Sequence, residues 1–179
     1  MCGLRQGEAL ALRWQDIDLD ADMLRVNRQL QRVRGGGGLR FSEPKNASRR
    51  TVGLPQRAVS ALKSHRRRQP EEKVAAGPLY RDEGLVFASG HGTPIDAQNV
   101  VNRYYKPLLK RAGLPAIRFH DLRHSCLSLL AQRGEPIRDL QALAGHATVA
   151  FTLQRYTHHY DASARRTAEA MGDILPYES

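Results

Sequence analysis

The segment RFHDLRHSCLSLLAQRG, residues 118–134, decides much of the fold, because most of it, residues 119–133, is typical of one amphipathic helix. Its apolar side chains recur at helical spacing and can supply one buried face: Phe119, Leu122, Cys126, Leu127, Leu129 and Leu130. The first turn instead carries two imidazoles and a guanidinium, on His120, His124 and Arg123. These polar groups need partners elsewhere in the chain, and the rest of the sequence has to supply them.

The bulk composition describes an ordinary globular chain. It has 179 residues, of which 41% are hydrophobic, which predicts about one domain with a real core. No apolar run approaches the roughly 18 residues of a membrane span, and the first residues, MCGLRQGEAL, do not resemble a secretion signal. Cys2 and Cys126 are far apart and lack CxxC spacing, so neither a disulfide framework nor a thiolate metal site is indicated. We therefore expect a cytoplasmic protein with no membrane partner.

The charge balance is more informative. Lys and Arg total 28 against 18 Asp and Glu, for a formal net charge of +10. A field of that sign attracts polyanions, and nucleic acid is the commonest of them. The charge therefore favours a partner with a phosphate backbone.

The pattern of apolar residues predicts a mainly α fold with a small three-stranded antiparallel sheet (α+β). Residues 4–14 are typical of a short helix, and alternation in 23–33, followed by 39–41 and 50–54, predicts the sheet. Pro55 suits the first turn of a helix that should end before Pro70. Further helices are expected over residues 96–112, 119–133, 137–144 and 149–156, with a last amphipathic stretch at 162–175.

Three other segments carry residues of chemical interest. GLRQGEALALRW places Arg5 three residues before Glu8, PKNASRRTVGLP places Lys45 at a hairpin turn, and LAGHATVAFTLQRYTHHYD contains His146 and Tyr156. Each has an ordinary explanation when taken alone: an ion pair at a helix start, a solubilising lysine, or a buried tyrosine. None of these segments assigns a function by itself.

The start of the 119–133 helix predicts a phosphate pocket. Helix N-termini attract anions through free N–H groups and the macrodipole, and His120 and Arg123 lie three residues apart beside one. A metal site is the alternative, because His120 and His124 are four residues apart. It lacks the Glu of an HExxH motif and any evident third ligand, so His124 is interpreted as a structural side chain.

Over residues 4 to about 158 the chain resembles the tyrosine recombinase (phage integrase) family. The resemblance rests on five features in this order: GLRQGE, a hairpin lysine, HDLRH, GH and a following tyrosine. The resemblance implies the fold of the family's catalytic domain. It also implies these catalytic residues: Arg5, Lys45, His120, Arg123, His146 and Tyr156.

The resemblance further implies the chemistry. Tyr156 would attack a DNA phosphate to give a 3′-phosphotyrosyl bond and a free 5′-hydroxyl, with His120 as the base and Lys45 as the acid. The arginine pair and an imidazole would stabilise the charge on the phosphate. Neither ATP, metal nor another cofactor is needed. The expected partner is double-stranded DNA, bound by a homo-tetramer of the full-length protein during phage, mobile-element or chromosomal recombination.

Other basic residues are expected to follow the DNA backbone without reading sequence: Arg49, Arg50, Arg66, Arg67, Arg68 and Arg103. Compared with the family, residues 1–179 are expected to be a catalytic domain that lacks its first helices and the N-terminal DNA-clamping domain. Residues 162–179 are expected to dock on a neighbouring protomer or to fold back on their own core.

Two other functions stay open at this point. One is a DNA-binding remnant of an integrase that occupies sites without cutting them. The other is a type IB topoisomerase-like enzyme, which shares the chemistry but relaxes supercoils as a monomer. The GLRQGE and GH segments favour the recombinase over the topoisomerase.

Overall fold

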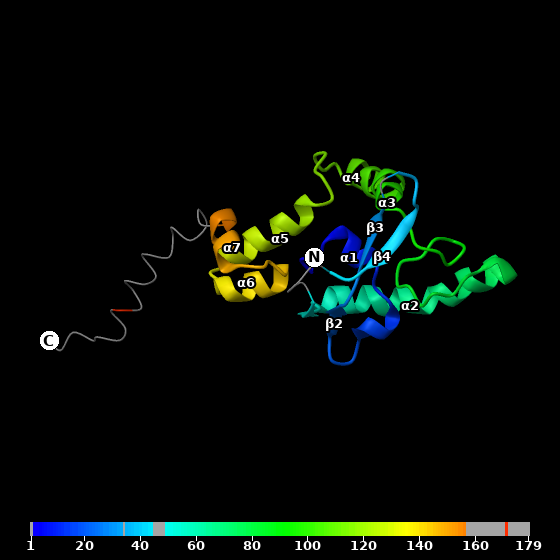
Figure 1. Cartoon of the computed structure of the whole chain (residues 1–179), viewed down its shortest axis with the longest axis horizontal. Helices are drawn as coiled ribbons and strands as arrows, with labels where there is room; N and C mark the ends of the chain where they lie inside the picture. The colour runs from blue at the N-terminus through cyan, green and yellow to red at the C-terminus, as the bar shows by residue number, and fades with distance from the viewer. Residues whose placement is uncertain (1, 34, 45–48, 157–170, 172–179) are drawn as a thin grey trace.

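The computed structural model describes residues 2–33, 35–44, 49–156 and 171 of the chain, and the predicted 162–175 helix lies outside them except for Met171. Helices dominate, and the strands are short and antiparallel (Figure 1), which confirms the predicted fold class. No helix in this described part of the chain is long and apolar enough to cross a membrane.

The strands form two sheets, so the single predicted sheet is corrected. One has the order β1 (Ile17–Asp18), β2 (Met23–Val26), β5 (Arg50–Gly53), and the other pairs β3 (Gln29–Arg32) with β4 (Leu39–Ser42). The expected strand over 23–33 breaks after Val26. At the break the side chains of Asn27 and Arg28 both donate to the buried carboxylate of Asp16, at 3.0 and 3.4 Å.

The β1–β2–β5 sheet packs one face on the long helix α2 (Gln56–Ala76). Alternate residues of the sheet are buried, with Leu24 opposite Val52, and they form a core with Val59 of α2. The predicted stop before Pro70 is wrong, since α2 continues through this proline. The adjacent Gln69 is buried, donates to the carbonyl of Leu85 at 3.0 Å and accepts from the Trp14 indole at 2.6 Å. These contacts hold the helix in place beyond its expected end.

The first helix, α1 (Gln6–Leu10), is shorter than the predicted 4–14 and packs on the β3–β4 hairpin. Its buried residue Leu10 lies with Leu30 of β3 in a small core. Helices α3 (Ala97–Val100) and α4 (Lys106–Arg111), joined by the π-helical turn η4 (Val101–Tyr105), follow the hairpin side of the molecule (Figure 1).

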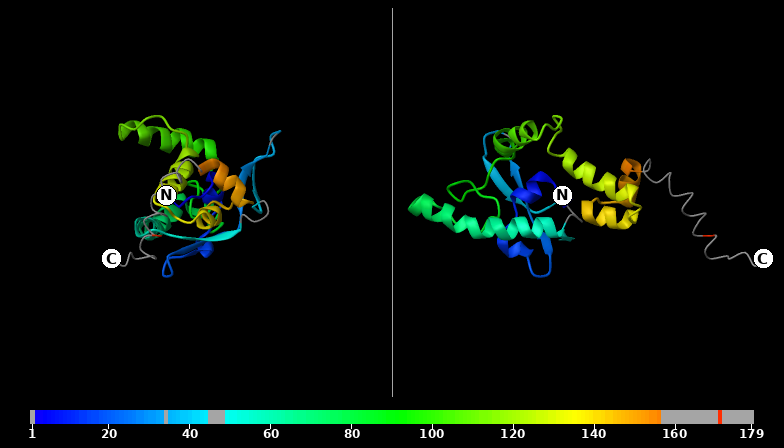
Figure 2. Two further views of the ribbon diagram at one scale, coloured as in Figure 1. Left: turned by 90° about the vertical axis from the view of Figure 1, so that its left-hand side faces the viewer. Right: turned by 180° about the vertical axis from the view of Figure 1, so that it is seen from behind.

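The last three helices form a separate layer at one end of the molecule (Figures 1 and 2). They are α5 (Asp121–Gln132), α6 (Ile137–Ala144) and α7 (Val149–Tyr156), and the last two have the predicted bounds. Their shared core is made by Leu127, Ala131, Leu140, Ala144 and Tyr156. Helix α1 lies between this layer and the sheets (Figure 1). Arg5, just before α1, contacts the layer through the carbonyl of Gly145.

Gly7 is required where α1 crosses β3. A Cβ at this position would lie 2.6 Å from the carbonyl oxygen of Leu30, which is backbone and cannot rotate away. We expect Gly7→Ala to lower the free energy of unfolding by about 1 to 3 kcal/mol, as measured by urea denaturation. Gly53→Ala is the matched control, since its Cβ would meet no atom within 4 Å. Equal losses in the two variants would contradict this explanation.

Candidate active site

Three arginines from distant segments meet at the C-terminal end of α6. Arg50 Nε donates to the carbonyl oxygen of residue 143 at 2.8 Å, and Arg123 Nη2 donates to that of residue 144. Arg5 Nη2 donates to the carbonyl of residue 145 at 3.1 Å. The last carbonyls of a helix lack partners within the helix and carry the negative end of its dipole. The end of α6 therefore attracts all three guanidinium groups to one place.

A buried carboxylate, that of Glu8, holds two of these arginines. Arg50 binds it with both terminal nitrogens, at 3.1 and 2.8 Å, and Arg5 donates to it from Nη1 and from its backbone N–H, both at 2.8 Å. Burial acts to raise the pKa of Glu8, but the hydrogen bonds and charge of Arg50 and Arg5 outweigh it and hold the pKa below its ordinary value. Glu8 is thus ionised at neutral pH.

Arg123 reaches inward from α5 and is 5% exposed. Its Nη1 donates to the carbonyl of Gly3, which ties the start of the chain to α5. Burial, and then the nearby charge of Arg5, lower the pKa of Arg123 to about 10, so it stays protonated at neutral pH. Among the residues that the structure describes, three guanidiniums meet at this site beside the single carboxylate of Glu8, so the positive charges outnumber the negative ones there.

His146 follows the turn at the end of α6. Gly145 there has a φ of +58°, and a Cβ on it would lie 2.8 Å from Arg50 Nη1, so glycine is favoured at this turn. The Nε2 of His146 lies 3.3 Å from Arg123 Nη2, and its Nδ1 lies 2.9 Å from the Thr152 hydroxyl. Since a guanidinium only donates, Nε2 is the acceptor and Nδ1 carries the hydrogen.

The environment of His146 disfavours its protonated form. Burial and the charges of Arg123 and Arg5 lower its pKa from 6.5 to about 4. The folded protein therefore binds this proton less well than the unfolded chain, and stability falls as the pH is lowered through this range.

We expect His146→Gln to remove part of this pH dependence. In the wild type, His146 alone should cost about 1 to 2 kcal/mol of unfolding free energy between pH 6.5 and 4, because its ring is only partly buried and solvent screens part of the effect. Urea denaturation at several pH values measures the slope, and the exposed His91→Gln serves as the control. A variant slope that equals the wild-type slope over this range would show that His146 is not perturbed.

Tyr156 ends α7 with its ring in the core of the last three helices, and it is 2% exposed. Its hydroxyl lies 3.4 Å from Nδ1 of His124. Burial raises the pKa of Tyr156, and the charges of Arg123 and Arg155 oppose this rise. The same two charges would stabilise a phenolate at this position.

His120 directly precedes α5 and is exposed. Its ring contacts that of His124 edge-to-face, with the centroids 4.7 Å apart. Burial of part of the ring and the charge of Arg123 lower its pKa, so His120 is neutral at neutral pH and able to accept a proton.

The predicted catalytic residues fall into two neighbouring groups, with Lys45 as the exception. Arg5, Arg123 and His146 are linked at the end of α6, and His120 and Tyr156 both contact His124. Lys45 lies outside the described residues. The spacing of His120 and His124 placed both on one side of the helix, but it did not indicate the contact of His124 with Tyr156.

The arginines expected to contact DNA occupy different environments. Arg50 has a side chain that is 7% exposed and is engaged with Glu8, so its position is internal rather than on the surface. Arg49 is exposed and pairs with Glu43, and Arg103 is exposed on η4. Arg50 therefore supports the site from within, a role that its position in an arginine-rich strand did not indicate.

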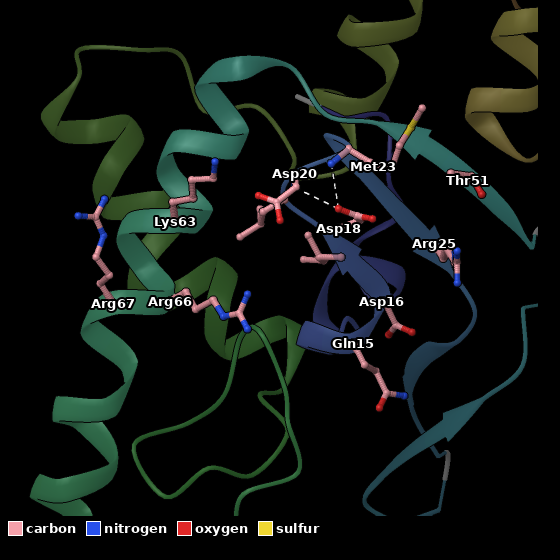
Figure 3. A pocket seen from close by; sticks show the side chains of 13 residues that line it. Gln15, Asp16, Asp18, Asp20, Met23, Arg25, Thr51, Lys63, Arg66 and Arg67 are labelled. Carbon is pink, nitrogen blue, oxygen red and sulfur yellow. Dashed lines mark hydrogen bonds between the residues drawn. The ribbon is translucent and has the colours of Figure 1, made fainter.

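The basic run on α2 is divided between two pockets. Arg66 and Arg67 line a pocket of about 890 Å³ with Lys63, opposite the acidic turn that contains Asp18 and Asp20 (Figure 3). Arg66 also lies over the ring of Trp14, 5.5 Å from its centroid. Arg68 lines a second, apolar pocket that extends to Arg123. The run thus does not form one continuous strip on the surface.

Metal ligands are not grouped in the part of the chain that the structure describes. No three His, Cys, Asp or Glu residues there come together as a possible metal site. The connected side chains of the site are instead hydrogen-bond donors, imidazoles and a phenol, a set suited to a phosphate group.

The fold and the site together define the class of protein. Residues 1–163 match the family model described as "Phage integrase family", so the chain belongs to this family, the tyrosine recombinases. It is 38% identical to a tyrosine recombinase XerC-like protein of Caldanaerobacter subterraneus subsp. tengcongensis, over 97% of this chain and 47% of that protein. It is 29% identical to the ICEBs1 integrase of Bacillus subtilis, over 98% and 47%. The chain spans about half the length of the curated relatives it matches.

Solved structures support the same family. A Tn1549 transposon integrase in complex with transposon right end DNA matches with a TM-score of 0.74 and 26% identity, over 96% of this chain and 55% of that one. The XerA recombinase matches with a TM-score of 0.65 and 26% identity, over 99% and 55%. The catalytic domain of bacteriophage HP1 integrase, at 16% identity and a TM-score of 0.55, shares the fold.

Proposed function

We propose that this chain is the catalytic region of a site-specific recombinase that cleaves and rejoins DNA through a 3′-phosphotyrosyl intermediate. The observation that carries the proposal is the meeting of Arg5, Arg123 and His146 at the end of α6, next to the helix that bears Tyr156. A DNA phosphodiester would be attracted by the excess positive charge there. A structural relative was solved in complex with transposon right end DNA, which supports DNA as the ligand.

The proposed step is a transesterification. The Tyr156 oxygen forms a bond to phosphorus, the bond from phosphorus to the 5′ oxygen breaks, and the two negative oxygens of the phosphate are stabilised by Arg5 and Arg123. The phenol proton passes to His120, and the leaving 5′ oxygen takes a proton from Lys45. Attack by another strand's 5′-hydroxyl reverses the step, so the bond energy is conserved.

DNA binding must also expose the nucleophile. The Tyr156 side chain is packed against Leu127 and Leu140 in the described structure, where a phosphate cannot reach it. We therefore propose that α7 moves relative to α6 when DNA occupies the arginines, which exposes the phenol oxygen while Tyr156 keeps its contact with His124 on α5. The full-length protein would supply further residues that clamp DNA, since this chain matches only 47% of the length of two of its relatives. We propose that it acts on DNA as a homo-tetramer.

The test is covalent capture on a nicked suicide DNA substrate, using the full-length protein. A recombinase should become attached to the 3′ end of the cut strand. Salt-sensitive binding without an attached product would instead favour a non-cutting DNA-binding remnant. Relaxation of supercoiled DNA by a monomer, with no joining of two sites, would favour a topoisomerase-like enzyme.

A further inference from the structure

His124 lies between the Tyr156 phenol and the guanidinium of Arg155. Its Nδ1 is 3.4 Å from the Tyr156 hydroxyl oxygen, and its Nε2 is 3.2 Å from Arg155 Nη2. We propose that His124 is a positioning residue, which holds the phenol oxygen of Tyr156 with an Nδ1–H donor, and that Arg155 selects this tautomer. The consequence for catalysis rests on the proposed function, whereas the tautomer itself does not.

The tautomer follows from the chemistry of arginine. A guanidinium has only N–H donors and no acceptor, so the His124 nitrogen that faces Arg155 has to be the acceptor. In a neutral imidazole the other nitrogen, Nδ1, then carries the hydrogen and points it at the Tyr156 oxygen. The opposite tautomer would aim the Nε2–H at the N–H groups of Arg155 and leave Nδ1 to accept from the phenol.

The charged surroundings keep His124 in the neutral form that this arrangement needs. Burial is the largest cause that lowers the pKa of His124, and the charges of His120 and Arg155 lower it further. Asp121 acts in the opposite direction, and Arg123 adds to the lowering. Around the phenol, Arg123 and Arg155 favour the phenolate and Cys126 opposes it. Protonation of His124 would give Nε2 a hydrogen and break its contact with Arg155.

An Nδ1–H donor acts on the nucleophile in two ways. It fixes the direction of the phenol oxygen on α7, and it bonds more strongly to that oxygen once the phenol has lost its proton, since the bond is then charge-assisted. A hydrogen bond that favours the charged form opposes the effect of burial on Tyr156. Because Nδ1 already carries a hydrogen, His124 cannot take the phenol proton, which leaves that role to His120.

The first experiment determines the tautomer in the full chain without DNA. Long-range ¹H–¹⁵N spectra of uniformly labelled protein distinguish Nδ1–H from Nε2–H for each histidine. We expect Nδ1–H at His124 in the wild type and in Arg155→Lys, which keeps a donor. Arg155→Leu should lose this preference. An Nε2–H tautomer in the wild type would overturn the inference, whether or not the protein cuts DNA.

The second experiment measures the rate of covalent attachment to a suicide substrate by the full-length protein. His124→Asn keeps an N–H near the position of Nδ1, whereas His124→Leu keeps similar bulk without a donor. We expect the Leu variant to be slower by about 10- to 100-fold, with unchanged DNA affinity, and the Asn variant to recover most of the rate. Because a purely structural role for the ring would slow both variants alike, equal rates would refute the proposal.

The two experiments separate this inference from the proposed function. No attachment by the wild type would count against the recombinase reaction, while the tautomer measurement would still decide how His124 holds Tyr156. Attachment by a wild type that has the Nε2–H tautomer would support the reaction and refute the role of His124. Thermal unfolding of each variant verifies that the compared proteins are folded.

Discussion

Tyr156→Phe is expected to abolish the covalent protein–DNA product, because the substitution removes the oxygen that forms the bond to phosphorus. The protein should remain folded. The ring keeps its packing against Leu127 and Leu140, and in the described part of the chain the substitution removes the 3.4 Å contact of the hydroxyl with His124. A loss of that size costs about 1 kcal/mol or less of unfolding free energy. The measurement is denaturing electrophoresis of the full-length protein after reaction with a suicide substrate.

Tyr105→Phe is the matched control for this experiment. Tyr105 is also buried, and its hydroxyl has no hydrogen-bond partner among the residues that the structure describes. The control should keep the covalent product and should bind DNA as the wild type does. A covalent product from Tyr156→Phe would assign the nucleophile to another residue and would remove the central element of the proposed site.

Glu8→Ala should have the largest effect on stability. The Glu8 side chain is 1% exposed and is the carboxylate that pairs with both Arg50 and Arg5. Without it the mostly buried guanidiniums of Arg50 and Arg123 repel each other with little screening by water. Removing one partner of a buried ion pair costs about 3 to 5 kcal/mol. Since small domains are stable by only about 5 to 15 kcal/mol, urea denaturation should detect the change readily.

The control for Glu8 is Glu43→Ala. Glu43 pairs with Arg49 at the surface, where both side chains are mostly exposed, so its loss should cost about 0 to 1 kcal/mol. Glu8→Gln, which keeps an acceptor without the charge, should lie between the two. A Glu8→Ala variant as stable as Glu43→Ala would mean that Arg5 and Arg50 do not depend on this carboxylate.

The two pH dependences of the site fall in different ranges. The pKa of Glu8 is lower in the folded protein than in the unfolded chain, so its stabilisation is complete above the unfolded value, about 4.3, and is lost as the pH falls through the lower folded value. His146 acts at higher pH, between 6.5 and about 4. Stability curves of the single variants should therefore separate the two contributions.

Local patterns predicted much of this molecule. The bounds of α6 and α7 follow from apolar spacing, which reports how one short segment can bury one face. The mainly helical class was predicted for the same reason. The order of the short motifs predicted which side chains share the site. Arg5, Arg123 and His146 meet at the end of α6, and His120 and Tyr156 both contact His124. The catalytic role of each stays a prediction.

Other features could not be obtained from local patterns. The break between β2 and β3 depends on Asp16, whose carboxylate accepts hydrogen bonds from the side chains of Asn27 and Arg28. The continuation of α2 past Pro70 depends on contacts of Gln69 with groups that are distant in the sequence. Arg50 was expected, with the other basic residues, to follow the DNA backbone. Its burial against Glu8 becomes visible only when β5 and α1 are placed together.

The sequence by itself determined the chemical groups available to this protein: the arginines, the imidazoles, the phenol and the helices that carry most of them. Only the tertiary structure decided how these groups are paired, because pairing depends on segments that lie far apart in the chain, such as Arg5 and Gly145. The tautomers of His124 and His146 are the clearest case. Each is set by which nitrogen faces a guanidinium, and helix packing, rather than any local pattern, brings that guanidinium into place.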